Sequence, residues 1–213
     1  MSELGIITID GPAASGKSSA ARLLAERYGV PYISSGTLYR AVAYLALGSE
    51  TDLHNGAALL AMLGEFRVVF EADTKGNYVL VNGTNVTGYL ATEAVDGAVS
   101  FIARIPEVRE WVNEKLQHLS APFVIDGRDM GTAVFPDAQV KFFLTASPRV
   151  RAQRRQKERG EDVAAIEAAL IARDELDKKQ SAPAADAVWI DSSELSLPEV
   201  LAAMSAQLPG IPT

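Results

Sequence analysis

Eight consecutive residues near the N-terminus have the types and spacing of a loop that holds nucleotide phosphates. Residues 11–18, Gly-Pro-Ala-Ala-Ser-Gly-Lys-Ser, match the pattern Gly-x₄-Gly-Lys-Ser/Thr in full. Gly11 and Gly16 let the backbone curl so that its N–H groups point inward, and a helix beginning near Lys17 adds its positive end. The alternative, an ordinary glycine-containing turn, is disfavoured because the pattern follows an expected strand and opens an expected helix.

Each polar side chain of this loop has an expected partner. The pattern predicts that Lys17 reaches the β- and γ-phosphates of ATP and that the Ser18 hydroxyl contacts Mg²⁺. GTPases, motor ATPases and small-molecule kinases all use such a loop, so it does not define the reaction. The residues expected to bind ATP are Gly11, Pro12, Ala13, Ala14, Ser15, Gly16, Lys17, Ser18 and Ser19.

A second polar cluster follows a buried strand expected at 123–126. Asp126 ends this strand, and Gly127-Arg128-Asp129 comes next. A carboxylate at a strand end that faces the phosphate loop is suited to steady the Mg²⁺ shell. Arg128 and Asp129 then emerge at the carboxyl edge of the sheet, where open α/β folds bind ligands. Asp126 alone has the alternative of a simple cap, but the cluster as a whole favours function.

Basic residues concentrate in one short stretch of an otherwise acidic chain. Six of them fall within residues 149–159, whereas the formal net charge is −7. Arg151 and Arg155 are four residues apart and share a helical face, with Arg154 beside them. Such a helix closing over the γ-phosphate would supply charge and expel water. A solvated basic helix is the alternative, and the phosphate loop favours the functional interpretation.

Arg40 is a further candidate, because it follows the second expected strand. Its guanidinium is suited to clamp an acceptor phosphate in bidentate fashion. From the residues alone, a surface arginine remains the alternative. No Asn-Lys-x-Asp motif occurs in the chain, which disfavours a GTPase switch.

The elements that must position these residues alternate between strand and helix, which predicts a parallel α/β sheet covered on both faces. The stretch 66–90 differs, since its short apolar runs and Asn82-Gly83 turn predict a small antiparallel insertion. Trp111 and Trp189 are expected in the core. Strands are expected at 4–9, 30–33, 123–126, 140–144 and 187–191, and helices at about 17–28, 36–47, 92–104, 106–118, after Pro148, 162–179 and 197–207.

The composition of the 213 residues fits a globular protein without disulfides, since hydrophobic residues make up 48% and cysteine is absent. No apolar run approaches the roughly 20 residues needed to span a bilayer, and residues 1–10 do not resemble a signal peptide. A cytoplasmic protein without a membrane partner is therefore expected. The acidic net charge argues weakly against nucleic acid as a partner.

Taken together, these segments resemble the bacterial cytidylate kinases, which phosphorylate CMP and dCMP within the P-loop nucleoside monophosphate kinase superfamily. The resemblance extends along essentially the whole chain. Its most specific part is Asp-Gly-Arg-Asp-Met-Gly-Thr at 126–132. The other segments are 8–18, Ser-Gly-x-x-Tyr-Arg at 35–40, Val-Phe-Pro-Asp-Ala at 134–138, Arg-Ala-x-Arg-Arg at 151–155 and Arg-Asp-x-x-Asp at 173–177.

The resemblance implies a P-loop kinase fold: five parallel strands with helices on both faces, a small antiparallel insertion and a short lid. It implies a single kinase domain over 1–213. Its core would comprise 1–40, 119–148 and 169–213, its monophosphate-binding region about 41–118 and its lid about 149–168. A monomer that uses ATP and Mg²⁺ in pyrimidine nucleotide metabolism is expected.

The resemblance also implies roles for individual residues. Ser35, Ser100, Arg109 and Asp129 are expected to form the CMP pocket, in which Asp129 accepts a hydrogen bond from the 4-amino group of cytosine. Asp177 is expected at the ribose hydroxyls, and residues 191–193 beside adenine. The residues expected around the CMP phosphate and sugar are Tyr39, Arg40, Arg128 and Arg173, and those expected to assist transfer are Lys17, Arg40, Arg128, Arg151, Arg154 and Arg155.

Two positions depart from the family pattern. Where many members carry an arginine three residues after the Arg-Asp-x-x-Asp segment, this chain has Gln180, which keeps a donor and an acceptor but no charge. An arginine common in the insertion is Ala91 here. Another nucleoside monophosphate kinase or small-molecule kinase is the alternative enzyme, and a nucleotide-dependent switch is the alternative of a different class.

Overall fold

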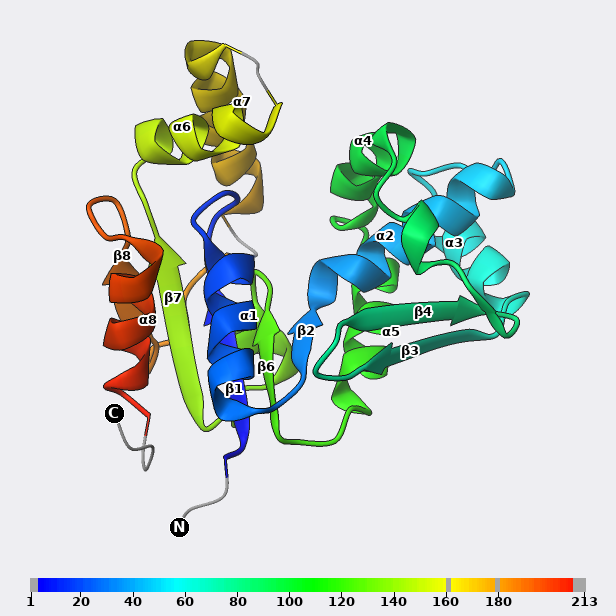
Figure 1. The fold of residues 1–213 in the computed structure, drawn as a ribbon. Coiled ribbons are helices and arrows are strands. Elements are labelled where there is room, and N and C mark those ends of the chain that lie inside the picture. The colour runs from blue at the N-terminus through cyan, green and yellow to red at the C-terminus, as the bar shows by residue number, and fades with distance from the viewer. Residues whose placement is uncertain (1–3, 160–161, 179–180, 209–213) are drawn as a thin grey trace. The chain divides into compact units, whose positions relative to one another are not determined.

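The computed structural model describes residues 4–159, 162–178 and 181–208 (Figure 1). The chain divides into two compact units. The first consists of Met1–Val30 together with Ala121–Thr213, and the second is Pro31–Ser120. The phosphate loop and the arginine-rich helix therefore belong to the first unit.

The larger sheet has five strands in the order β2-β6-β1-β7-β8, as expected for a parallel α/β fold. The central strand β1 pairs in parallel with β6 on one side and with β7 on the other. Its residues Ile7 and Ile9 are fully buried, because side chains of a central parallel strand point to sheet faces that helices cover. The strands are β1 (Ile6–Asp10), β2 (Tyr32–Ser34), β6 (Phe123–Asp126), β7 (Val140–Thr145) and β8 (Val188–Asp191).

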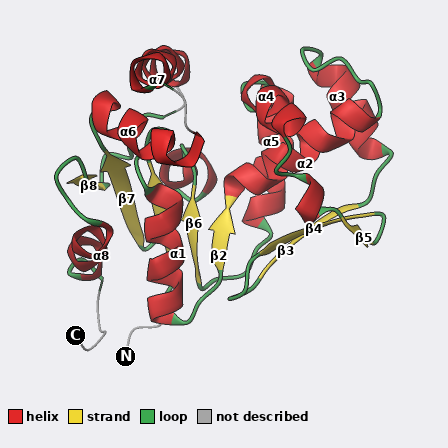
Figure 2. Ribbon diagram, turned by 45° about the horizontal axis from the view of Figure 1, so that its top comes forward, coloured by secondary structure: helices red, strands yellow, loops and turns green. Residues whose placement is uncertain are grey.

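The α-helices of the first unit, within its described residues, are α1 (Lys17–Tyr28), α6 (Pro148–Arg159), α7 (Val163–Asp177) and α8 (Leu197–Ser205). Helix α1 begins after Gly16 and ends at Gly29, and both glycines have left-handed backbone angles. Helices α1 and α8 contact each other on one face of the sheet (Figures 1 and 2). Helix α6 packs against α7 through Ala152, Ile166 and Leu170.

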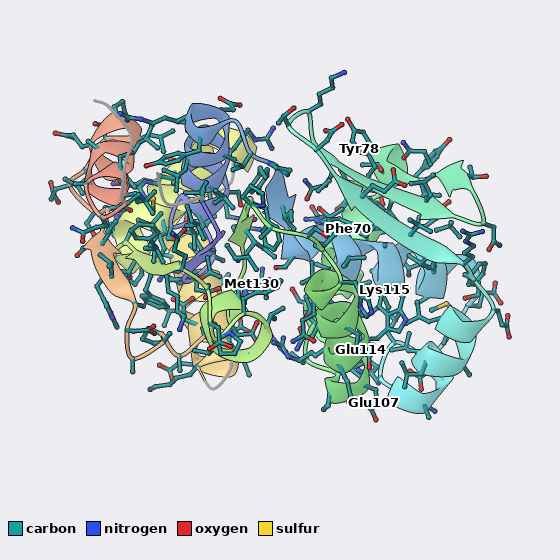
Figure 3. All side chains as sticks on the ribbon, turned by 90° about the horizontal axis from the view of Figure 1, so that it is seen from below. Phe70, Tyr78, Glu107, Glu114, Lys115 and Met130 are labelled. Carbon is teal, nitrogen blue, oxygen red and sulfur yellow. The ribbon has the colours of Figure 1, made fainter. Side chains whose placement is uncertain are left out.

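The second unit contains the predicted antiparallel sheet, with strands in the order β3-β4-β5. Phe70 and Tyr78 mark its first two strands in Figure 3, and the Asn82-Gly83 turn joins β4 to β5. The unit also contains four α-helices among its described residues, and α2 packs against the other three, α3, α4 and α5. The elements are α2 (Ser35–Gly48), α3 (Gly56–Gly64), β3 (Val68–Ala72), β4 (Asn77–Val81), β5 (Thr84–Asn85), the 3₁₀ turn η1 (Thr87–Tyr89), α4 (Glu93–Ile102) and α5 (Pro106–Gln117).

Helix α3 was not expected from the sequence. Its residues are almost all small or apolar, so they give no polar face and no helical periodicity. The local signal is Asn55, whose side chain accepts a hydrogen bond from the N–H of Ala58 and caps the helix. The helix is held by burial of Leu59 and Leu63, and tertiary packing therefore decides its existence.

The expectation that both tryptophans are in the core was wrong. Trp189 is 60% exposed, because β8 is the outermost strand of its sheet, and the ring packs against Phe143 at 4.7 Å between centroids. Trp111 is half-buried on α5, with the ammonium group of Lys115 5.5 Å from its ring centroid. Within the described residues, none of the helices is long and apolar enough to cross a membrane.

Gly11 has no room for a side chain. Its φ is +145°, and a Cβ at this position would overlap the backbone carbonyl oxygen of Leu144 in the neighbouring strand β7. The chain leaves β1 here and turns over the end of β7 into the phosphate loop. We infer that glycine is required for the loop to begin at this point.

We expect Gly11→Ala to lower the free energy of unfolding by about 3 kcal/mol, through backbone strain and overlap with Leu144. Gly97→Ala is the matched control, because Gly97 lies inside α4 with open space around its Cβ position. The control should be neutral or stabilise by up to about 1 kcal/mol. Urea denaturation measures both, and equal stabilities of the two variants would contradict the packing argument.

Candidate active site

The phosphate loop occupies the connection between β1 and α1, as the sequence predicted. The ammonium group of Lys17 donates a hydrogen bond to the carbonyl oxygen of Pro12 at 2.6 Å. Burial lowers the pKa of Lys17 to about 8, partly opposed by the nearby carboxylate of Asp126. Lys17 is therefore mostly charged at neutral pH but loses its proton more readily than an exposed lysine, and an anion beside it would favour the charged form.

Ser18 and Asp126 lie together below this loop. The Ser18 hydroxyl donates a hydrogen bond to a carboxylate oxygen of Asp126 at 2.7 Å. The parallel pairing of β1 with β6 brings Ser18 and Asp126 together, because it places the end of β6 next to the start of α1. Hard oxygen donors from one hydroxyl and one carboxylate suit Mg²⁺, which takes its remaining ligands from water and phosphate.

Asp10, at the end of β1, holds the segment that follows Asp129. Its two carboxylate oxygens accept hydrogen bonds from the N–H groups of Met130 (2.9 Å) and Gly131 (2.7 Å). Burial raises the pKa of Asp10 to about 6, against the lowering effect of these two bonds. Met130, labelled in Figure 3, begins a short π-helical turn, η2 (Met130–Val134). Asp10 therefore holds the segment after the polar cluster 126–129 close to the start of the phosphate loop.

Arg128 and Arg173 share one carboxylate. Asp177, on α7, is 6% exposed and forms an ion pair with Arg128, and Nε of Arg173 lies 3.6 Å from the same oxygen. Both guanidinium groups act electrostatically on Lys17 and lower its pKa. Three expected acceptor-side residues of the first unit are thus brought together near the phosphate loop.

Arg151 is buried and fully engaged in the protein. Its guanidinium donates to the carbonyl oxygens of Ala146 (2.9 Å) and Ala13 (3.2 Å) and pairs with the carboxylate of Asp174 at 2.5 Å. Only 3% of its side chain is exposed. Arg151 consequently connects α6, the phosphate loop and α7.

Arg154 makes a second connection to the phosphate loop. It donates to the carbonyl oxygens of Ser15 (3.2 Å) and Ser192 (2.6 Å) and to the Ser192 hydroxyl (3.0 Å). Ser192 is buried, and its Oγ also lies 3.1 Å from the Ser15 carbonyl oxygen and 3.0 Å from that of Thr145. The loop after β8 and helix α6 therefore hold the same turn of the phosphate loop.

A cavity of about 430 Å³ opens along the phosphate loop, within the size range of small-ligand sites. One part is polar, where Lys17, Arg154 and Arg155 line it beside the loop backbone. The other part is apolar, and such a surface is suited to a planar base next to a phosphate chain. The apolar lining comes from Leu144, Leu195, Leu197 and Val200.

The second unit contributes the other expected residues. Tyr39 is buried on α2, and the guanidinium carbon of Arg109 lies 5.9 Å from its ring centroid. Arg109 also donates to the carbonyl oxygen of Ala103 at 3.0 Å. Ser35 is buried at the first turn of α2, and Ser100 is half-buried on α4. This unit thus places Arg109 against the buried ring of Tyr39, while Arg40 forms an ion pair with Asp96.

Several residues of the site were missed by the sequence reasoning. Asp10 and Asp174 lie inside segments quoted for the family resemblance but received no role, and Ser192 was expected only beside adenine. Asp96 was not considered, although it forms an ion pair with Arg40. For Asp10, Asp174 and Ser192 the available signal was a carboxylate or hydroxyl inside a segment already quoted, whereas the sequence around Asp96 gives no such signal. Gln180 lies outside the described residues.

Comparison with known proteins shows which family the chain belongs to. A relative from Deinococcus deserti, named cytidylate kinase, is 54% identical over 96% of this chain and 99% of its own length. Another of the same name, from Thermus thermophilus, is 52% identical over 96% and 98%. A solved structure of an uncharacterized protein from Eubacterium ventriosum shares the fold, with a TM-score of 0.50, 14% identity and coverage of 96% and 97%. The family model described as cytidylate kinase matches residues 7–209, and the chain belongs to the cytidylate kinase family.

Proposed function

We propose that this protein transfers the γ-phosphoryl group of ATP to the phosphate of CMP or dCMP, giving the diphosphates. The observation that carries the proposal is the cationic pair Arg128 and Arg173 within electrostatic reach of Lys17. A nucleotide switch needs one phosphate site, whereas a kinase needs a second cation set beside the first. Membership of the cytidylate kinase family supports CMP as the acceptor.

On the donor side, we propose that residues 11–19 and Lys17 hold the ATP phosphates and that the apolar part of the cavity takes adenine. Ser18 would hold Mg²⁺ directly, and Asp126 would act through water. The ion would neutralise charge on the phosphate oxygens. The Ser18–Asp126 hydrogen bond supports this assignment, because it already brings the two oxygen donors together.

On the acceptor side, we propose nine residues as CMP ligands, on the family resemblance of their motifs. They are Ser35, Tyr39, Arg40, Ser100, Arg109, Arg128, Asp129, Arg173 and Asp177. Asp129 accepts from the cytosine amino group and repels the carbonyl that uracil carries there. A site built around one hydrogen bond can reject the analogue that lacks it.

Transfer itself needs position and charge more than covalent chemistry. An oxygen of the acceptor phosphate attacks the γ-phosphorus as the bond to the bridging oxygen breaks. Lys17, Arg40, Arg128 and Arg155 would stabilise the spreading negative charge. Arg151 and Arg154 would act mainly by holding the lid, residues 149–168, against the phosphate loop, which their hydrogen bonds to Ala13 and Ser15 support.

We further propose a cytoplasmic monomer that acts on free nucleotides rather than on nucleic acid. The net charge of −7 supports the last point, since polyanions favour basic surfaces. Residues 41–118 would form the monophosphate-binding region, and the remainder the core and lid.

A coupled assay of ADP formation with CMP, dCMP, UMP, AMP and shikimate tests the acceptor. We expect CMP and dCMP to be preferred, and Asp129→Ala to raise the KM for CMP by about 10–100-fold because the cytosine amine loses a charged partner. The KM for ATP should change less than about threefold. Preference for another acceptor would reject the proposed substrate, and an equal loss with both nucleotides would make Asp129 structural.

The pKa of about 8 for Lys17 predicts a pH dependence of donor binding. Lys17 becomes neutral as the pH rises through this value, so the affinity for a non-hydrolysable ATP analogue should fall about tenfold per pH unit above it. Calorimetric titration between pH 7 and 9.5 measures the effect. Lys17→Ala should bind weakly at every pH, and a variant that keeps the wild-type slope would disprove the assignment.

Asp126→Asn should raise the Mg²⁺ concentration needed for half-maximal rate by about tenfold, because the carboxylate no longer steadies the hydrated ion. Asp137→Asn is the control, since Asp137 is an exposed acid in the loop before β7. Rates measured across a Mg²⁺ titration at saturating nucleotide separate the two. Identical titration curves would remove Asp126 from the metal site.

A further inference from the structure

Arg40 is held on one side only. Its Nη1 lies 2.5 Å from a carboxylate oxygen of Asp96 and donates a hydrogen bond to the carbonyl oxygen of Leu90 at 3.0 Å. Arg40 belongs to α2, Asp96 to α4, and Leu90 follows the turn η1. Two separate segments of the second unit thus converge on a single nitrogen of one guanidinium group.

The number of donors explains what this arrangement leaves available. A guanidinium group has five N–H donors, of which two are on Nη1. Asp96 and Leu90 use both. Within the described residues, Nε and Nη2 of Arg40 have no hydrogen-bond partner. The edge formed by these two nitrogens is the one that binds two oxygens of a phosphate in parallel.

The Arg40–Asp96 pair contributes little as a surface ion pair. The two side chains are 35% and 32% exposed, and pairs with such exposure stabilise a fold by less than about 1 kcal/mol. Asp96 is itself well fixed, because it lies in the first turn of α4, where the helix dipole favours a carboxylate and Thr92 caps the helix. A rigid carboxylate at this position is better suited to orient Arg40 than to stabilise the fold.

We propose that Asp96 is a positioning residue for the acceptor phosphate: it occupies Nη1 of Arg40 and so presents the Nε–Nη2 edge to the monophosphate. This inference rests on the proposed function, in which Arg40 binds that phosphate. Residue 91, next to Leu90, is alanine, so this segment contributes a carbonyl oxygen and no charge of its own. The orientation of Arg40 therefore governs how the second unit binds the phosphate.

Two substitutions at Asp96 separate orientation from charge. Asp96→Ala removes the acceptor and should raise the KM for CMP by about tenfold, since a hydrogen bond to a charged group is lost. Asp96→Asn keeps an oxygen that accepts from Nη1 and should stay within about threefold of the wild-type KM. The kcat and the affinity for an ATP analogue should remain within about threefold in both variants.

Glu93→Ala is the matched control, because it removes an exposed acid from the same turn of α4 and should leave the KM for CMP unchanged. An unchanged KM in Asp96→Ala, or an Asn variant as impaired as the Ala variant, would overturn the positioning role. A fall in kcat and melting temperature together with the rise in KM would also overturn it, in favour of a structural role.

Arg40→Ala, measured in parallel, distinguishes this inference from the proposed function. If Arg40→Ala leaves the KM for CMP unchanged, the proposed phosphate role of Arg40 fails. If it raises the KM while Asp96→Ala does not, only the positioning role fails. In the double variant, loss of Asp96 should have no further effect, because the residue acts through Arg40.

Discussion

The hydrogen bonds of Asp10 are the interaction on which the rest of the active site depends. This buried carboxylate accepts hydrogen bonds from the N–H groups of Met130 and Gly131. Gly11, the residue after Asp10, begins the phosphate loop. A carboxylate whose pKa is raised to about 6 by burial is not placed there for stability. It is held because two backbone donors face it, and it fixes the distance between the phosphate loop and the Arg128–Asp129 segment.

Around this point the structure repeatedly uses charged side chains to hold backbone carbonyl groups. Arg151 and Arg154 donate to Ala13 and Ser15 of the phosphate loop, and Asp174 fixes the guanidinium of Arg151. A loop whose N–H groups must face a polyanion has carbonyl groups that point away and need donors. Arg151 and Arg154 meet that need, so both have a structural role in holding the phosphate loop.

The second unit follows the same principle for its own cations. Arg40 and Arg109 each donate to a backbone carbonyl oxygen, of Leu90 and Ala103 respectively. Arg40 also pairs with Asp96, and Arg109 also lies against the ring of Tyr39. Long flexible side chains lose less entropy on binding a ligand when they are already oriented. Both substrates of the proposed reaction would thus meet arginines that the protein has arranged in advance.

The sequence by itself determined the phosphate loop, the alternation of strands and helices, the antiparallel insertion and the family, because these depend on local spacing and on residues adjacent in the chain. It did not predict α3, whose uniform apolar residues have no periodicity, or the exposure of Trp189, which depends on β8 being an edge strand. Only the tertiary structure decided the partners: Asp10 with Met130, Arg151 with Asp174 and Arg40 with Asp96. Each pair joins distant segments, and a charged residue in a sequence does not indicate which of many opposite charges it will meet.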